Sequence, residues 1–142
     1  MLRRLLSLFR RDQEPDAGAY GERLAADWLK RERGFALVAR NWRSPRDRRD
    51  ELDLVCRDRE VLVFVEVKAR AADARVSGFH AVDRRKKRVL RRVITDYLAR
   101  LTEKPRTIRF DVVEISLSGG PGTPPEIRHY ENVPLFSKYF RA

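Results

Sequence analysis

The chain has 142 residues, with 32 Lys and Arg against 21 Asp and Glu, which gives a formal charge of +11 at pH 7. This length suits one domain, and 42% of hydrophobic residues is close to the globular norm, so the composition excludes wholesale disorder. A single cysteine, Cys56, excludes an intramolecular disulfide framework and a multi-cysteine zinc site. We therefore expect a reduced, cytoplasmic protein whose positive charge attracts polyanions such as nucleic acid.

Residues 1–15 predict a basic amphipathic N-terminal tail ahead of a single domain over residues 16–142. The start, MLRRLLSLFRR, interrupts its apolar run with arginines, so we do not expect a signal peptide. No stretch approaches the ~20 apolar residues of a membrane-spanning helix. A loosely docked terminus is the favoured interpretation, and a segment that rests on a membrane surface or on nucleic acid is the alternative.

Apolar periodicity and breaker residues divide the chain into helices and strands. In chain order we expect a helix over 17–33, strands over 35–42, 51–57 and 61–69, a helix whose apolar stripe runs over 82–101, and strands over 107–117 and 126–131. Loops fill 43–50 and 70–81, and a turn-rich linker covers 118–125. This order predicts an α/β sandwich in which helices flank a central mixed β-sheet.

The most informative segment is ELDLVCRDREVLVFVEVKAR, residues 51–70. Side chains alternate along a strand, so one face carries Val61, Val63, Val65 and Val67, and the other carries Leu62, Phe64, Glu66 and Lys68. Both faces begin apolar, as in a central strand that is buried on both sides. A carboxylate and an ammonium group placed in this pattern need compensation.

The preceding strand supplies a partner for these charges. Its side chains divide into Glu51 and Asp53 on one side and Leu52, Leu54 and Cys56 on the other. A turn centred on residues 58 and 59 pairs residues whose numbers sum to about 117, which sets Asp53 opposite Phe64 and Glu51 opposite Glu66. Acidic groups this close repel one another unless they share a proton or a cation, and Mg²⁺, which prefers oxygen ligands, resolves the conflict.

Lys68 then has a chemical role beside the metal. Its ammonium group can steady an attacking water or the charge that develops on a scissile phosphate. The alternative is a buried ion pair between Glu66 and Lys68 that only neutralises the site.

Asp53 followed by Glu66-Val67-Lys68 resembles the PD-(D/E)xK signature of restriction-endonuclease-like nucleases. The wider pattern, over roughly residues 17–135, is similar to the YraN family of small bacterial proteins. The matching segments include Tyr20-Gly21-Glu22, Arg40-Asn41, Glu51-Leu52-Asp53-Leu54-Val55, Val63-Phe64-Val65-Glu66-Val67-Lys68 and Arg109-Phe110-Asp111-Val112-Val113.

The resemblance implies a restriction-endonuclease-like fold and a metal-dependent phosphodiesterase that uses Mg²⁺ or Mn²⁺. It implies Asp53, Glu66 and Lys68 as catalytic residues, and Asp53, Glu66, Glu51 and Glu22 as metal ligands. The chain departs from the family pattern at Asp50, where Gly is usual, and at Lys87, where Gln is common. These departures bear on substrate contacts more than on the metal site.

Basic residues gather in the loop over 43–50 and on the second predicted helix. We expect phosphate contacts, which position a nucleic acid without reading its sequence, from Arg43, Arg46, Arg48, Arg49, Arg85, Lys86 and Lys87. Lys86 lies on the apolar stripe, so it either snorkels to the rim or points into the cleft, and the resemblance favours the cleft. Asp111 is expected to pair with an arginine as a structural group, and the alternative is that it reaches the site.

Two functional classes are left. The first is a Mg²⁺- or Mn²⁺-dependent endonuclease that acts on DNA, including branched or single-stranded structures. The second is a non-catalytic, basic nucleic-acid-binding protein with a structural or vestigial acidic cluster. The intact trio Asp53, Glu66 and Lys68 favours the first. A homodimer is left open, and a membrane-surface adaptor that uses the amphipathic start is a weaker third hypothesis.

Overall fold

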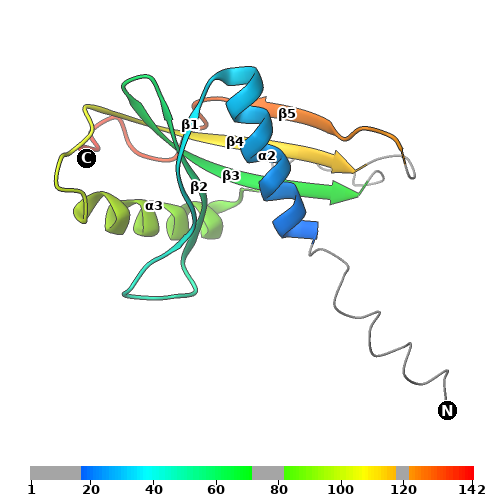
Figure 1. The fold of residues 1–142 in the computed structure, drawn as a ribbon. Coiled ribbons are helices and arrows are strands. Elements are labelled where there is room, and N and C mark those ends of the chain that lie inside the picture. Colours follow the sequence, from blue (N-terminus) through cyan, green and yellow to red (C-terminus); the bar gives the residue numbers. More distant parts are fainter. Residues whose placement is uncertain (1–16, 72–81, 118–121) are drawn as a thin grey trace, which may run out of the picture.

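A computed structural model describes residues 17–71, 82–117 and 122–142, and these contain a five-stranded sheet and two helices (Figure 1). The elements are α2 (Ala17–Arg33), β1 (Ala36–Arg43), β2 (Glu51–Asp58), β3 (Val61–Ala71), α3 (Arg84–Ala99), β4 (Thr107–Leu117) and β5 (Glu126–Tyr130). The tail over residues 1–15 lies outside the described residues. Among the helices described, none combines the length and apolar character needed to cross a bilayer.

The sheet has the order β1-β2-β3-β4-β5 and is mixed. β3 and β4 are parallel, whereas the β1–β2, β2–β3 and β4–β5 pairs are antiparallel. Parallel neighbours need a crossover connection, and α3 lies in the chain between β3 and β4. This architecture confirms the predicted α/β class with a central mixed sheet, and it is consistent with a restriction-endonuclease-like fold.

Each face of the sheet is buried under one helix. On one face Leu62, Phe64, Phe110 and Val112 pack with Leu90, Val93 and Ile94 of α3. On the other face Val63, Val65, Val113 and Ile115 pack with Ala25 and Leu29 of α2. Figure 1 shows the two helices crossing the sheet in different directions. The alternation along β3 is what the sequence predicted, and β4 shows the same alternation, which makes these two strands the centre of the fold.

The helix boundaries follow from local signals. α2 ends at Arg33, and Gly34 follows it with φ +68°, a left-handed conformation that glycine adopts without steric cost. α3 begins after Asp83, whose side chain accepts a hydrogen bond from the backbone N–H of Lys86 at 2.8 Å. The predicted bounds of α2 are confirmed, whereas α3 begins two residues later than the apolar stripe suggested.

The predicted register of the β2–β3 hairpin is wrong by two residues. Leu54 lies opposite Val65 and Asp58 opposite Val61, so the turn is centred on Arg59 and Glu60. Arg59 has φ +55°, which identifies it as a turn residue. Because the shift is an even number of residues, every β3 side chain keeps its predicted face.

The predicted alternation along β2 is also wrong at one point. Leu54 and Cys56 pack on the α2 side, but Leu52 packs on the α3 side. In the neighbouring strand β1, Asn41 has φ +48° and lies between the residues that pair with Leu54 and Leu52. The two strands therefore distort together beside Asp53, where the site forms.

Candidate metal centre and its basic surroundings

Three carboxylates from two elements converge beside the first residues of β2, before the pairing of β2 with β3 begins. Glu22 comes from α2, and Glu51 and Asp53 come from β2; one oxygen from each lies within 4.8 Å of the other two. Glu22 reaches this position because Gly21 lies almost against β3. A Cβ added to Gly21 would lie 2.8 Å from the Cβ of Ala69, so only glycine permits this approach.

Asp53 lies where the pairing of β2 with β3 ends. Its carboxylate accepts a hydrogen bond from the backbone N–H of Val67 at 2.8 Å, one step beyond the last paired residues. Burial, the negative charge of Glu66 and that of Glu22 raise the pKa of Asp53 to about 7, although the Val67 N–H and the charge of Lys86 act in the opposite direction. Burial and the neighbouring acids together therefore disfavour the ionisation of Asp53.

Glu66 is buried, with a side chain only 2% exposed. Its Oε1 lies 3.1 Å from Nζ of Lys68 and 3.2 Å from Nζ of Lys86. Its Oε2 is buried and has no hydrogen-bond partner among the described residues. The ion pair between Glu66 and Lys68 that the alternative interpretation required is thus present, but it satisfies only one of the two carboxylate oxygens. A buried carboxylate oxygen without a partner is costly, which makes it a position that a cation would stabilise.

The residues present fit a divalent cation with oxygen ligands. Among the described residues, the three donors of this group are all carboxylates, the ligand set that Mg²⁺ and Mn²⁺ prefer. Glu66 does not belong to the group of three carboxylates with mutual distances within 4.8 Å, but its charge acts on Asp53. Glu51 is also paired with Arg43, at 2.8 Å. The site therefore brings the four acids that the sequence singled out into one region, with Glu66 set deepest.

A pocket of about 530 Å³ opens onto the three carboxylates. The residues around it include Asn41, Arg43, Arg49, Lys86 and Val89 together with the acids. The cleft position predicted for Lys86 is confirmed, because its ammonium group contacts Glu66 and lines this pocket. Asn41, which the sequence did not single out as a site residue, also lines it, and its positive φ is visible only in the folded chain.

The basic loop between β1 and β2 is held against α3 by buried acids. Asp96 of α3 accepts a hydrogen bond from Ser44 Oγ at 2.6 Å and lies 3.4 Å from Arg46. Asp50 pairs with Arg92 of α3 through two bonds of 2.6 and 2.8 Å. Sequence reasoning missed this role of Asp50, Asp96 and Arg92. The only signal was the acidic residue at position 50, where the family pattern usually has glycine.

The expected nucleic-acid contacts divide into two sets. Arg43, Arg49 and Lys86 line the pocket that opens onto the three carboxylates, which we call the acidic pocket. Arg49 and Lys86 also line a neighbouring pocket, together with Arg85. Arg46, Arg48 and Lys87 line neither of these two pockets; Arg46 is tied to Asp96, and Arg48 is exposed on the loop. The structure thus places three of the seven predicted residues around the candidate metal centre and a fourth, Arg85, in the neighbouring pocket.

A second polar cluster lies away from these pockets. Asp111 binds Arg109 at 2.8 and 3.0 Å and His129 at 2.8 Å, so the expected pairing with an arginine is confirmed. Burial opposes the ionisation of Asp111, but hydrogen bonds from His129 and Arg109 hold its pKa below the ordinary value. Asp111 also accepts the backbone N–H of Asn132, which ties β4 to the chain after β5. This cluster stabilises the fold.

The fold and the site together define a restriction-endonuclease-like α/β protein with an acidic centre between α2 and the start of β2. Comparison with known proteins identifies the family. The uncharacterised protein family UPF0102 matches residues 21–115 of the chain. The chain therefore belongs to the UPF0102 family, which confirms the resemblance to the YraN family.

Proteins similar to this chain carry the same family name. A UPF0102 protein of Beutenbergia cavernae is 49% identical over 98 residues, which cover 69% of this chain and 80% of that protein. One of Anaeromyxobacter dehalogenans is 42% identical over 113 residues, covering 80% and 79%. One of Mycolicibacterium gilvum is 40% identical over 126 residues, covering 87% of this chain and 98% of that protein.

Proposed function

We propose that this protein is a Mg²⁺- or Mn²⁺-dependent endonuclease that hydrolyses phosphodiester bonds in DNA. The observation that carries the proposal is the convergence of three carboxylates beside Glu66, whose buried Oε2 has no partner among the described residues. Such an arrangement is costly unless a cation binds to it. The order Asp53, Glu66, Lys68 on two adjacent strands agrees with the PD-(D/E)xK resemblance.

In this proposal the chain's own groups have distinct roles. Asp53, Glu66, Glu51 and Glu22 would hold the metal, which when bound polarises a phosphate oxygen and lowers the pKa of water. Lys68 is half-buried, and its ammonium group lies 3.1 Å from Glu66. It would orient the attacking water or stabilise the charge on the phosphate, because a fixed ammonium group stabilises developing negative charge most strongly in a site with little water.

The charge of the chain supports a nucleic acid as the substrate. The formal charge is +11, the acidic pocket is lined by Arg43, Arg49 and Lys86, and further arginines of α3 line the pocket beside it. Cations beside an acidic centre attract the phosphate backbone toward a site that would otherwise repel it. We propose binding through phosphates, on branched or single-stranded DNA.

A non-catalytic nucleic-acid-binding protein is the second candidate. It is favoured by the ion pairs of Glu66 with Lys68 and Lys86, which neutralise much of the acidic charge without a metal. This candidate predicts DNA binding without metal-dependent cleavage.

Cleavage assays with matched variants separate the two candidates. Flap, fork, four-way-junction and single-stranded DNA substrates are incubated with and without Mn²⁺. We expect cleavage by the wild type, its loss in Asp53→Asn and Lys68→Ala, and full activity in the exposed control Lys30→Ala, with DNA binding kept by all variants. Equal cleavage by the wild type and both site variants would indicate contamination and refute the nuclease proposal. Binding without cleavage would support the second candidate.

A further inference from the structure

A second pocket, of about 570 Å³, lies beside the acidic one. Both pockets are lined by Arg49, Lys86 and Val89, so they are contiguous. The second pocket has five cationic side chains and three acidic ones around it, from the 44–50 loop and from α3: Arg49, Arg85, Lys86, Arg88, Arg92, Asp47, Asp50 and Asp83. We refer to it as the basic pocket.

The two walls of the basic pocket are fastened to each other. Asp50, on the loop, is buried and forms two hydrogen bonds with Arg92, on α3. The buried pair of Ser44 and Asp96 adds a second link between the same two elements. A pocket whose walls are held in this way does not need to be ordered when a ligand binds, which lowers the entropic cost of binding.

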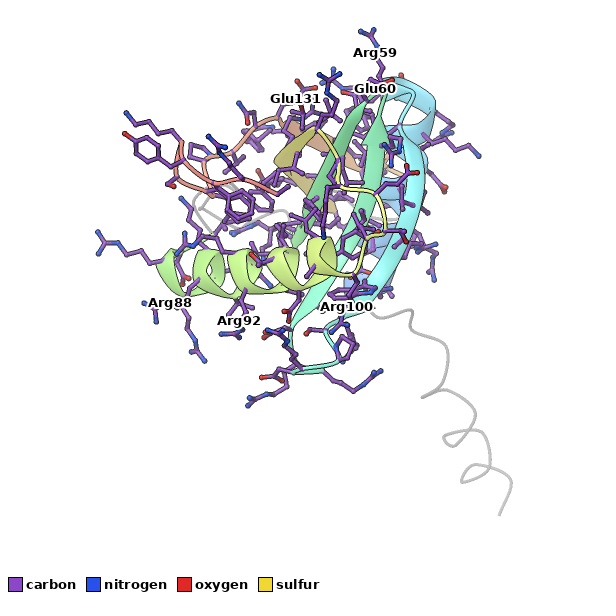
Figure 2. The ribbon with its side chains drawn as sticks, turned by 90° about the vertical axis from the view of Figure 1, so that its left-hand side faces the viewer. Arg59, Glu60, Arg88, Arg92, Arg100 and Glu131 are labelled. Atoms are coloured by element: carbon purple, nitrogen blue, oxygen red, sulfur yellow. The ribbon has the colours of Figure 1, made fainter. Side chains whose placement is uncertain are left out.

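The charges of the basic pocket are not fully balanced within it. Asp47 pairs with Arg49, Asp50 pairs with Arg92, and Asp83 caps the first turn of α3. Arg85 and Arg88 are both exposed and have no ion pair with any described residue. They lie three residues apart on α3, hence on one face of the helix. Figure 2 shows Arg88 and Arg92 projecting outward from α3.

Two free guanidinium groups in a preformed pocket fit a phosphate group. A guanidinium group offers a planar fork of N–H donors that matches two phosphate oxygens, and its charge cannot be lost by deprotonation. The carboxylates of Asp47, Asp50 and Asp83 surround the same pocket, so its excess of positive charge is small. It suits a phosphodiester with one negative charge better than a terminal phosphate with nearly two.

We propose that the basic pocket binds a backbone phosphodiester of the same DNA strand whose scissile phosphate lies over the acidic pocket. This assignment rests on the proposed function in one respect: it takes the phosphate over the acidic pocket to be the scissile one. The basic pocket would then set the position of the strand along the cleft, while the acidic pocket carries out the chemistry. Arg85 and Arg88 are binding residues in this arrangement.

Binding of single-stranded DNA without metal tests the proposal. The double variant Arg85→Gln/Arg88→Gln is compared with the control Arg100→Gln/Arg106→Gln. The control removes the same charge from exposed arginines at and beyond the other end of α3 (Figure 2). At the rise of an α-helix, Arg100 is about 18 Å from Arg88. The probe is an oligonucleotide of about 20 nucleotides labelled at its 3′ end, measured by fluorescence anisotropy in EDTA over a range of salt.

We expect the Arg85/Arg88 variant to bind about ten-fold more weakly, with a salt dependence reduced by roughly one phosphate contact. The Arg100/Arg106 variant is expected to bind much as the wild type does. Equal weakening in the two double variants would overturn the proposal, because it would show a general effect of charge. Thermal melting of each variant establishes that the fold is intact.

The ends of the probe distinguish the two kinds of phosphate. If the Arg85/Arg88 variant loses the same affinity for a probe with a 5′-hydroxyl as for one with a 5′-phosphate, the ligand is a phosphodiester. A loss confined to the 5′-phosphate probe overturns it in favour of a strand end.

Cleavage keeps this result separate from the nuclease proposal. If the wild type fails to cut DNA but the Arg85/Arg88 variant still loses affinity, the basic pocket stands and the nuclease proposal fails. If the wild type cuts and the Arg85/Arg88 variant binds and cuts like its control, the basic pocket fails and the nuclease proposal stands.

Discussion

We expect Asp53→Asn to make the metal-free protein more stable at neutral pH. Asp53 is surrounded by carboxylates and titrates near pH 7 in the folded chain, against 3.8 for an ordinary aspartate. Asparagine removes the charge but keeps a side-chain oxygen that can accept the hydrogen bond from the backbone N–H of Val67. The substitution therefore isolates the cost of ionising this group.

The size and sign of the effect follow from linkage. Between about pH 4 and about pH 7 the folded chain holds a proton on Asp53 that the unfolded chain has released, so the wild type loses stability as the pH rises through this window. At about 1.4 kcal/mol per pH unit, the full window corresponds to about 4 kcal/mol. We expect a measured effect of about 2–4 kcal/mol.

The assay is urea unfolding in EDTA, followed by circular dichroism at several values between about pH 4 and about pH 8. The variant minus wild-type difference in unfolding free energy is expected to be small near pH 4 and to grow toward pH 8. The exposed control Glu126→Gln is expected to show no such growth. Adding Mn²⁺ near pH 8 should stabilise the wild type and not the variant. A difference that stays constant with pH would refute the electrostatic reasoning.

Three further predictions concern the packing and charges that hold the site. Gly21→Ala places a methyl group 2.8 Å from the Cβ of Ala69, so we expect a loss of about 1–3 kcal/mol in urea unfolding together with weaker Mn²⁺ stabilisation. At Gly34 an added methyl group has open space, but the backbone φ of +68° is unfavourable for alanine. Gly34→Ala is therefore expected to cost about 1–2 kcal/mol and to leave the stabilisation by Mn²⁺ unchanged. Equal stabilisation by Mn²⁺ in the two variants would contradict the role assigned to Gly21. Asp111→Asn unbalances an ion-pair network around a fully buried carboxylate and is expected to cost about 3–5 kcal/mol near pH 7. Because the pKa of Asp111 lies below its ordinary value, this cost is expected to shrink as the pH falls below the ordinary pKa of aspartate. A cost below about 1 kcal/mol near pH 7, as expected for an exposed pair, would refute this.

The sequence by itself determined the elements and the faces of the central strands. The helix over 17–33 and the strand over 107–117 have the predicted bounds, because apolar periodicity and breaker residues act within a few neighbours along the chain. The alternation along β3 placed Glu66 and Lys68 on one face without any knowledge of the register. An error of two residues in the hairpin left those faces unchanged, since the period of a strand is two.

The tertiary structure decided what no local pattern encodes. Lys86 contacts Glu66 although it lies 20 residues further along the chain. Asp50 pairs with Arg92 across a separation of 42 residues. The distortion at Asn41 and Leu52, which places Asp53 at the end of the strand pairing, also arises only in the assembled sheet. These contacts depend on how separate elements pack, because periodicity fixes the face on which a side chain lies but not the residue that it meets from another element.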